Sequence, residues 1–362
     1  MHRPRGIPAI VILASGPAGT QLWCLRGGEP AARTTLELPI APLPTATVPH
    51  LRLRATPSGS LWLRLPFGPR VPAARLGHID EQLCLVPPVP GAGRIALHSA
   101  RAQPGDTVAV LDDRRLWVLD GPAWRAVELP AYVSARQASV GPDGVWWVAG
   151  ARRAGRVGRS DTVATICRLE PGSVAFRSAT PRLGPLAAVA VARRRGLDAL
   201  HDVDAEDAPV VAVADGGAEP VSFVYARTAA GRWVAGRVGQ LAARIVRPAQ
   251  GRVSVVAADG TILDVAAGGR LRGHPPAGLH RLLRCVAGVD PDARFLVRGA
   301  DALGDTVVLA VGAYRLTGPR LVWTANAVVR SRDAGATWSI LAATAPAAGE
   351  PELPDAAILR PG

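Results

Sequence analysis

The sequence predicts an all-β fold: a single seven-bladed β-propeller closed by a C-terminal strand that completes the first blade. Three observations predict it: a high content of Gly and Pro, a repeat of about 50 residues, and a first repeat that lacks one strand. The 362 residues include 39 Gly and 33 Pro, and both residue types disfavour helix interiors. Hydrophobic residues make up 48% of the chain, enough to bury a large core. Six or eight blades are the alternatives.

The repeat is visible in two copies of a long unit. In the first, Gly105-Asp106-Thr107-Val108 is followed by Trp117 and then by Trp124. In the second, Gly304-Asp305-Thr306-Val307 is followed by Trp323 and then by Trp338, and the copies start 199 residues apart. At about 50 residues per unit this distance is four units, a spacing typical of propeller blades with four antiparallel strands.

The chain divides into seven tentative blades on this basis. Their expected ranges are 7–39 with 355–359, 48–90, 94–130, 135–180, 185–238, 241–275 and 279–345. The first range holds only three strands, whereas the strand-like segment 355–359 has no place in the last blade. Because an open ring would expose unpaired strand edges, we expect segment 355–359 to supply the missing strand.

The fifth blade has the weakest pattern. Its segment 186–191 is apolar and is compatible with a strand or a helix. The basic and acidic residues from Arg193 to Asp207 that follow read as an inserted, solvated loop. A division into two domains at this point is the alternative organisation.

One motif is specific. Residues 331–338 read Ser-Arg-Asp-Ala-Gly-Ala-Thr-Trp and fit the pattern S-x-D-x-G-x-T-W. The motif resembles the Asp-box, or bacterial neuraminidase repeat, found in sialidase-like and Ycf48-type propellers. The resemblance implies a turn between the third and fourth strands of a blade, built from the following residues: Ser331, Asp333, Gly335, Thr337 and Trp338.

Each residue type has a physical role in such a turn. An Asp carboxylate accepts backbone N–H groups, Gly adopts positive φ, and Trp packs between blades. Degenerate versions of the turn are expected at Asp120 with Trp124 and at Gly231 with Trp233. We expect Trp124, Trp233 and Trp338 to be largely buried, with structural rather than catalytic roles.

Sialidase chemistry would require an arginine triad, a tyrosine nucleophile and an acidic proton donor. Tyr314, followed by Arg315, is the tyrosine best placed along the chain. The early Arg-Ile-Pro signature of those enzymes is absent. We predict no catalytic residues, and an enzyme would be recognised by carboxylates and arginines that converge on the innermost strands.

The net charge of +13 comes entirely from arginine, because the chain has 42 basic residues and no lysine. A GC-rich genome explains that bias better than an anionic partner does. The candidates for anion binding are two clusters: Arg152, Arg153 and Arg156, and Arg193, Arg194 and Arg195. Neither is interleaved with aromatic residues that would stack on bases, so nucleic-acid binding is the weaker alternative.

The four cysteines lie about 60 or more residues apart in apolar segments and form no Cys-x-x-Cys pair. We therefore expect buried free thiols, with disulfides between strands as the alternative, and no metal or cofactor. The apolar segment near the N-terminus reads as a first strand better than as an export signal, which favours a cytoplasmic protein, with export as the alternative.

These observations predict a bacterial, non-catalytic scaffold or interaction module that binds a protein partner, without membrane insertion. A sialidase-like protein that binds or hydrolyses a glycan is the alternative.

Overall fold

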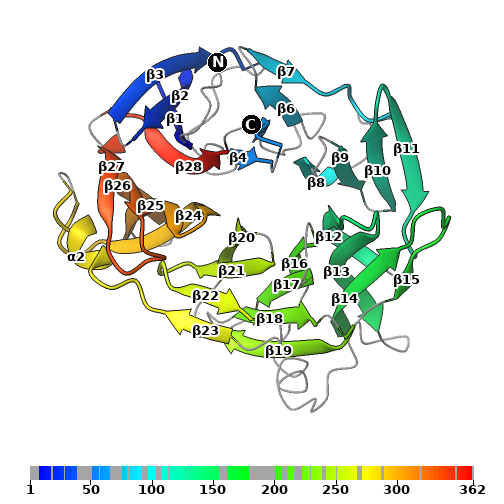
Figure 1. Cartoon of the computed structure of the whole chain (residues 1–362). Helices are drawn as coiled ribbons and strands as arrows, with labels where there is room; N and C mark the ends of the chain where they lie inside the picture. Colours follow the sequence, from blue (N-terminus) through cyan, green and yellow to red (C-terminus); the bar gives the residue numbers. More distant parts are fainter. Residues whose placement is uncertain are drawn as a thin grey trace.

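Seven four-stranded antiparallel sheets form a closed ring in the computed structural model of the chain (Figure 1). The ring is the predicted seven-bladed β-propeller. The structure describes residues 8–360 except for 18, 28, 39–50, 57, 66–75, 80–81, 92–96, 103–106, 113, 132, 155–160, 179–199, 206–209, 216–221, 229, 239–241, 250, 267–270, 287–288, 318–319 and 347–348.

The strands of each blade are given from the axis outward. Blade 1 has β28 (Glu352–Leu359), β1 (Ala9–Gly16), β2 (Gly19–Arg26) and β3 (Glu29–Leu36). Blade 2 has β4 (Arg52–Ala55), β5 (Leu61–Arg64), β6 (Leu76–Ile79) and β7 (Leu83–Leu85). Blade 3 has β8 (Leu97–Ala102), β9 (Val108–Asp112), β10 (Arg115–Asp120) and β11 (Ala123–Glu128). Blade 4 has β12 (Val133–Val140), β13 (Trp146–Ala154), β14 (Asp161–Leu169) and β15 (Arg177–Ser178).

The remaining three blades follow the same order. Blade 5 has β16 (Leu200–Asp204), β17 (Val210–Asp215), β18 (Ser222–Arg227) and β19 (Trp233–Val238). Blade 6 has β20 (Ala242–Ala249), β21 (Arg252–Ala257), β22 (Ile262–Val265) and β23 (Leu271–His274). The short helix α2 (Leu279–Leu283) precedes blade 7, which has β24 (Arg294–Leu303), β25 (Thr306–Thr317), β26 (Arg320–Ser331) and β27 (Ser339–Thr344).

The C-terminal strand closes the ring as predicted. Strand β28 pairs antiparallel with β1, with Ala9 opposite Leu359 and Leu13 opposite Asp355. In Figure 1 this red strand lies on the axis side of the blue strands of blade 1. Strand β1 is buried along its length because it is a central strand of its sheet.

The core is distributed between the blades rather than gathered in one centre. One cluster lies between blades 7 and 1 and includes Ile12, Leu25, Val308, Val328 and Ile358. Other clusters fill the spaces between blades 1 and 2, 3 and 4, 5 and 6, and 6 and 7. Blades 1, 6 and 7 each contact two of these clusters, so their sheets bury both faces, which explains their strongly apolar strands.

Antiparallel strands alternate direction, so the connections divide between two faces of the ring. We call the face with the turns between first and second strands, and between third and fourth strands, the turn face. We call the opposite face the loop face. The 199-residue repeat occupies equivalent positions, because Trp117 and Trp323 lie on the third strands β10 and β26 of blades 3 and 7.

Two expectations are corrected. Asp202 and Asp204 do not belong to an inserted loop but to β16, the innermost strand of blade 5. Segment 186–191 lies outside the described residues. All four cysteines are free, but only Cys24 and Cys167 are buried, whereas Cys84 and Cys285 lie on exposed positions.

Within the described ranges, no helix has the length and apolar character needed to cross a membrane.

Candidate functional site

The turn 331–338 connects the third and fourth strands of blade 7 and is held by side chains. Ser331 Oγ donates to Asp333 Oδ1 at 2.7 Å and accepts the N–H of Gly335 at 2.7 Å. Asp333 accepts the N–H of Thr337 at 2.8 Å and its hydroxyl at 2.6 Å. These bonds favour the ionised carboxylate and lower the pKa of Asp333 to about 2. The arrangement fixes the turn, with Gly335 at φ 98°.

The tryptophan of this turn is half-buried, not largely buried as expected. Trp338 packs against the cluster between blades 6 and 7, while its indole Nε1 is buried without a hydrogen-bond partner in the described residues. The shallower position follows from its place just before β27, the outermost strand of the blade. One side of the indole therefore remains near solvent.

The two degenerate turns also connect third and fourth strands, and their tryptophans are half-buried too. Trp124 follows Asp120 and donates from Nε1 to the carbonyl of Pro87 in blade 2 at 3.2 Å. Trp233 follows Gly231 and packs edge to face on Trp147 of blade 4, with ring centroids 6.0 Å apart. Like Trp338, each tryptophan thus contacts the preceding blade.

Most of the predicted anion-binding arginines lie outside the described residues. Arg152 and Arg153 lie near the end of β13, and Arg156, Arg193, Arg194 and Arg195 lie outside the described residues. Tyr314 is on β25, the second strand of blade 7, where it packs edge to face on Trp323.

Charged side chains from several blades meet instead at the central channel. Asp355 on β28 is fully buried, and both of its carboxylate oxygens accept Nη1 of Arg244 at 2.8 Å. Arg244 comes from β20 of blade 6. The same pair contacts blade 2, because the N–H of Leu53 donates to Asp355 and Arg244 Nη2 donates to the carbonyl of Leu53. The pair therefore joins blades 6, 1 and 2 across the channel.

A second arginine, which is buried, binds the beginning of β28. Arg298 on β24 is 3% exposed and donates to Glu352 at 2.9 Å and to Asn326 at 2.7 Å. Its guanidinium also lies 4.5 Å from the ring centre of Trp323. Burial lowers the pKa of Arg298, and the nearby carboxylates partly offset this effect.

The acidic groups of this network have structural partners. Asp301 accepts the N–H of Ile358 on β28 at 2.8 Å, while burial raises the pKa of its carboxyl. Together with Asp355 and Glu352 it holds the closing strand. Although carboxylates and arginines converge on the innermost strands, each of these three carboxylates binds an arginine or backbone N–H groups. In the described ranges no three His, Cys, Asp or Glu side chains group closely enough to hold a metal.

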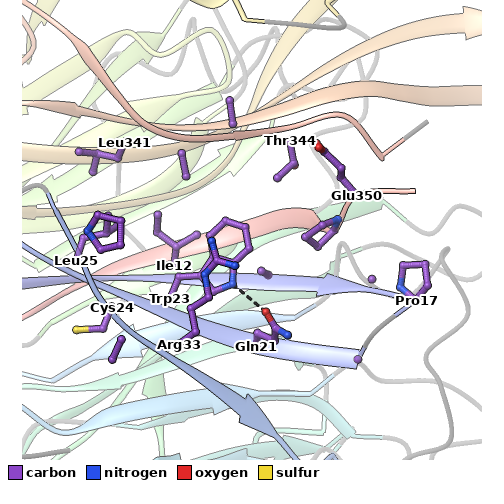
Figure 2. A pocket seen from close by; sticks show the side chains of 18 of the residues that line it. Ile12, Pro17, Gln21, Trp23, Cys24, Leu25, Arg33, Leu341, Thr344 and Glu350 are labelled. Atoms are coloured by element: carbon purple, nitrogen blue, oxygen red, sulfur yellow. Dashed lines mark hydrogen bonds between the residues drawn. The ribbon is translucent and has the colours of Figure 1, made fainter. Parts of the chain in front are cut away.

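A groove of about 490 Å³ lies between blades 7 and 1, and we call it the seam groove (Figure 2). Strand β27 forms one side, with four consecutive lining residues, 341–344. Ile12, Trp23 and Leu25 of blade 1 form the other side. The chain around Gly16, Pro17 and Gly19 connects the second and third strands of blade 1 and closes the end of the groove at the loop face.

The seam groove contains a prearranged aromatic and cationic pair. Trp23 donates from Nε1 to Gln21 at 3.0 Å, and the exposed Arg33 guanidinium lies 4.7 Å from the Trp23 ring centre. Opposite them, a register shift in β27 places Leu341 as an extra residue between the paired residues Ile340 and Ala342. Such a bulge redirects a side chain, and Leu341 lines the groove.

Sequence reasoning missed both the channel network and the seam groove. The alternation Leu51-Arg52-Leu53-Arg54 around β4 indicates a strand with arginines on one side. With 42 arginines in the chain, however, that signal could not single out Arg244 or Arg298. The residues of the groove lie far apart in the sequence and adjoin only because the ring closes between blades 7 and 1.

No protein family and no curated protein matches the chain. Among solved structures, the chain is similar to the dihydro-heme d1 dehydrogenase NirN, with 14% identity and a TM-score of 0.53, covering 98% of this chain and 77% of that one. It is also similar to virginiamycin B lyase from Staphylococcus aureus, with 12% identity and a TM-score of 0.49, covering 84% and 92%. A third similar structure is YCF48 bound to a D1 peptide, with 10% identity and a TM-score of 0.46, covering 85% and 92%. At 14% identity, the likeness to NirN shows the fold alone.

Proposed function

We propose that the chain is a non-catalytic interaction module that binds an extended segment of a protein partner in the seam groove. The observation that carries the proposal is the Trp23–Arg33 pair, which lines a groove of about 490 Å³ beside strand β27. Tryptophan and arginine are enriched among the residues that dominate binding energy at protein interfaces.

The backbone beside the groove also suits a peptide. Strand β27 is the last strand of its sheet, and among the described residues only one of its edges pairs with a neighbouring strand. An extended peptide can add to such an edge through main-chain hydrogen bonds while pockets accept alternate side chains. Trp23 and Leu341 offer an apolar pocket for one of these side chains.

The central channel supports a binding role over glycan hydrolysis. A glycosidase needs one carboxyl group as a proton donor and a second as a nucleophile or base. Here Asp355 is fully buried and bound to Arg244, and Glu352 is bound to Arg298. Both carboxylates are held by the contacts that close the ring.

The proposal is tested by selecting heptapeptides from a displayed random library on the immobilised full chain. We expect enriched peptides to bind the full chain in solution. Trp23→Ala or Arg33→Ala should lower the affinity of these peptides by about tenfold or more, as expected for a dominant interface residue. Trp124→Ala is the matched control, because it removes another half-buried tryptophan far from the groove.

Two results would overturn the proposal. One is selection of peptides whose affinity is the same for the wild-type chain and for the Trp23→Ala and Arg33→Ala variants, with unfolding temperatures showing that both variants are folded. The other is turnover of a panel of sialosides by the wild-type chain, which would establish an enzyme.

A further inference from the structure

A second depression lies between the same two blades but on the turn face, and its volume is about 580 Å³. We call it the basic depression. Apolar side chains form its walls: Pro8, Ile10, Leu25, Leu303 and Ile358. Three arginines complete the lining: Arg330, Arg332 and Arg360. No carboxylate lines it within the described part of the chain.

The charge of Arg330 has no counterpart there. Arg330 is the last but one residue of β26, the third strand of blade 7, and among the described residues no carboxylate forms an ion pair with it. Its Nε is buried without a hydrogen-bond partner in those residues. Burial and the charge of Arg332 both lower the pKa of Arg330. A half-buried guanidinium that lies beside a second one, with its Nε buried and unpaired, is a costly arrangement that a bound anion would relieve.

The hydrogen bonds of the turn 331–338 fix the backbone at Arg332. Arg332 stands between Ser331 and Asp333, whose side chains bind each other at 2.7 Å. Its own guanidinium reaches the carbonyl of Gly27 in blade 1 at 3.4 Å. The locked turn thus places Arg332 at the boundary of the two blades, and the arginine is already extended over the basic depression.

Arg360 connects the basic depression to the channel. It lines both the depression and a cavity of about 40 Å³ at the channel, where Arg54, Arg244 and Arg247 also lie. Asp301 supplies a carboxylate at this cavity. Even if Asp301 balances Arg360, the two charges of Arg330 and Arg332 remain uncompensated in the depression.

We propose that the basic depression binds a small amphipathic anion, an apolar body that carries a phosphate or carboxylate group. The volume lies within the range of about 300–1,000 Å³ that small-molecule sites occupy. The guanidinium groups of Arg330 and Arg332 match the planar, bidentate recognition of phosphate or carboxylate. The walls from Ile10 to Leu303 receive the apolar body.

This site goes beyond the proposed peptide groove. Among the described residues their linings share only Leu25. The seam groove extends to the loop face at Gly16 and Gly19, whereas the basic depression lies at the turn face. A ligand in the basic depression therefore leaves Trp23 and Arg33 accessible, and a failure of one proposal does not entail failure of the other.

The test is calorimetric titration of the full chain with decyl phosphate below its micelle concentration. We expect saturable binding that weakens as salt increases. Inorganic phosphate and decanol should each bind at least about tenfold more weakly than decyl phosphate. Inorganic phosphate lacks the apolar body, and decanol lacks the anionic group. Equal affinity for decanol, equal affinity for inorganic phosphate, or no binding of decyl phosphate would overturn the proposal.

Variants locate the site. Arg332→Met, at an exposed position, should weaken the binding of decyl phosphate by about tenfold. Arg330→Met should weaken this binding at least as much. Arg125→Met, which removes an exposed arginine from blade 3, should leave the affinity unchanged. An unchanged affinity in Arg332→Met, or an equal loss in Arg125→Met, would show that the anion does not bind in the basic depression.

Discussion

Arg244 and Asp355 form an ion pair of 2.8 Å that connects blade 6 to the strand that closes the ring. They also bind the N–H and carbonyl of Leu53, which belong to the innermost strand of blade 2. An innermost strand has no strand partner on its channel side, so its backbone groups need other partners. The ion pair supplies them and joins three blades at once.

Removal of the Asp355 carboxylate should destabilise the fold strongly. Asp355→Ala removes the acceptor of the Leu53 N–H and the β28 carboxylate that Arg244 binds, and loss of one member of a buried pair costs about 3–5 kcal/mol. Urea denaturation measures the change. Asp305→Ala is the control, because Asp305 forms an exposed ion pair with Arg252 that contributes about 1 kcal/mol or less. Similar losses in the two variants would contradict the structural role of Asp355.

Gly299 is required by the approach of Asp355. A Cβ atom at this position of β24 would overlap the carboxylate of Asp355. Gly299→Ala should therefore displace the closing strand and cost about 1–3 kcal/mol, as overpacking of a core does. At Gly273 an added Cβ would meet Leu263 at an ordinary 3.7 Å, so Gly273→Ala should be neutral or slightly stabilising. The unfolding temperatures of the two variants are compared. An unchanged unfolding temperature of Gly299→Ala would contradict the close approach of the Asp355 carboxylate to Gly299.

The contribution of Asp333 should depend on acidic pH. Its folded pKa of about 2 lies below the ordinary value of 3.8, so its ionised form stabilises the fold. That stabilisation is fully present above about 3.8 and is lost as the pH falls through about 2. The unfolding temperature of Asp333→Asn should be below that of the wild type at pH 6, with the gap closing toward pH 2. Asp292→Asn, at an exposed loop position, should show no such closing gap.

Trp338 should tolerate phenylalanine better than alanine. Because the indole is half-buried, Trp338→Ala should cost about 2 kcal/mol, less than the 3–5 kcal/mol typical of a fully buried tryptophan. Trp338→Phe keeps most of the contact between blades 6 and 7 and removes a buried N–H that has no partner in the described residues, so it should be close to neutral. Chemical denaturation measures the free energy of unfolding of both variants. Equal losses in Trp338→Ala and Trp338→Phe would mean that packing of the aromatic ring contributes little.

The repeat could be predicted because it is a local pattern. A blade is a meander of neighbouring strands, so its turns and apolar segments follow one another in the sequence. The turn 331–338 is equally local, since Ser331, Asp333 and Thr337 bind each other within seven residues. The missing strand of blade 1 followed from the need to pair strand edges.

The tertiary structure decided how deeply the tryptophans are buried. It also decided which residues meet in the channel, in the seam groove and in the basic depression. Position along a blade, which local sequence does not report, makes Trp338 half-buried. Arg244 and Asp355 lie 111 residues apart, and Arg332 reaches Gly27 across 305 residues. In a chain with 42 arginines, sequence alone could not select those that meet. Closure of the ring selects them, because it brings the first blade against the last and gives each buried charge its neighbours.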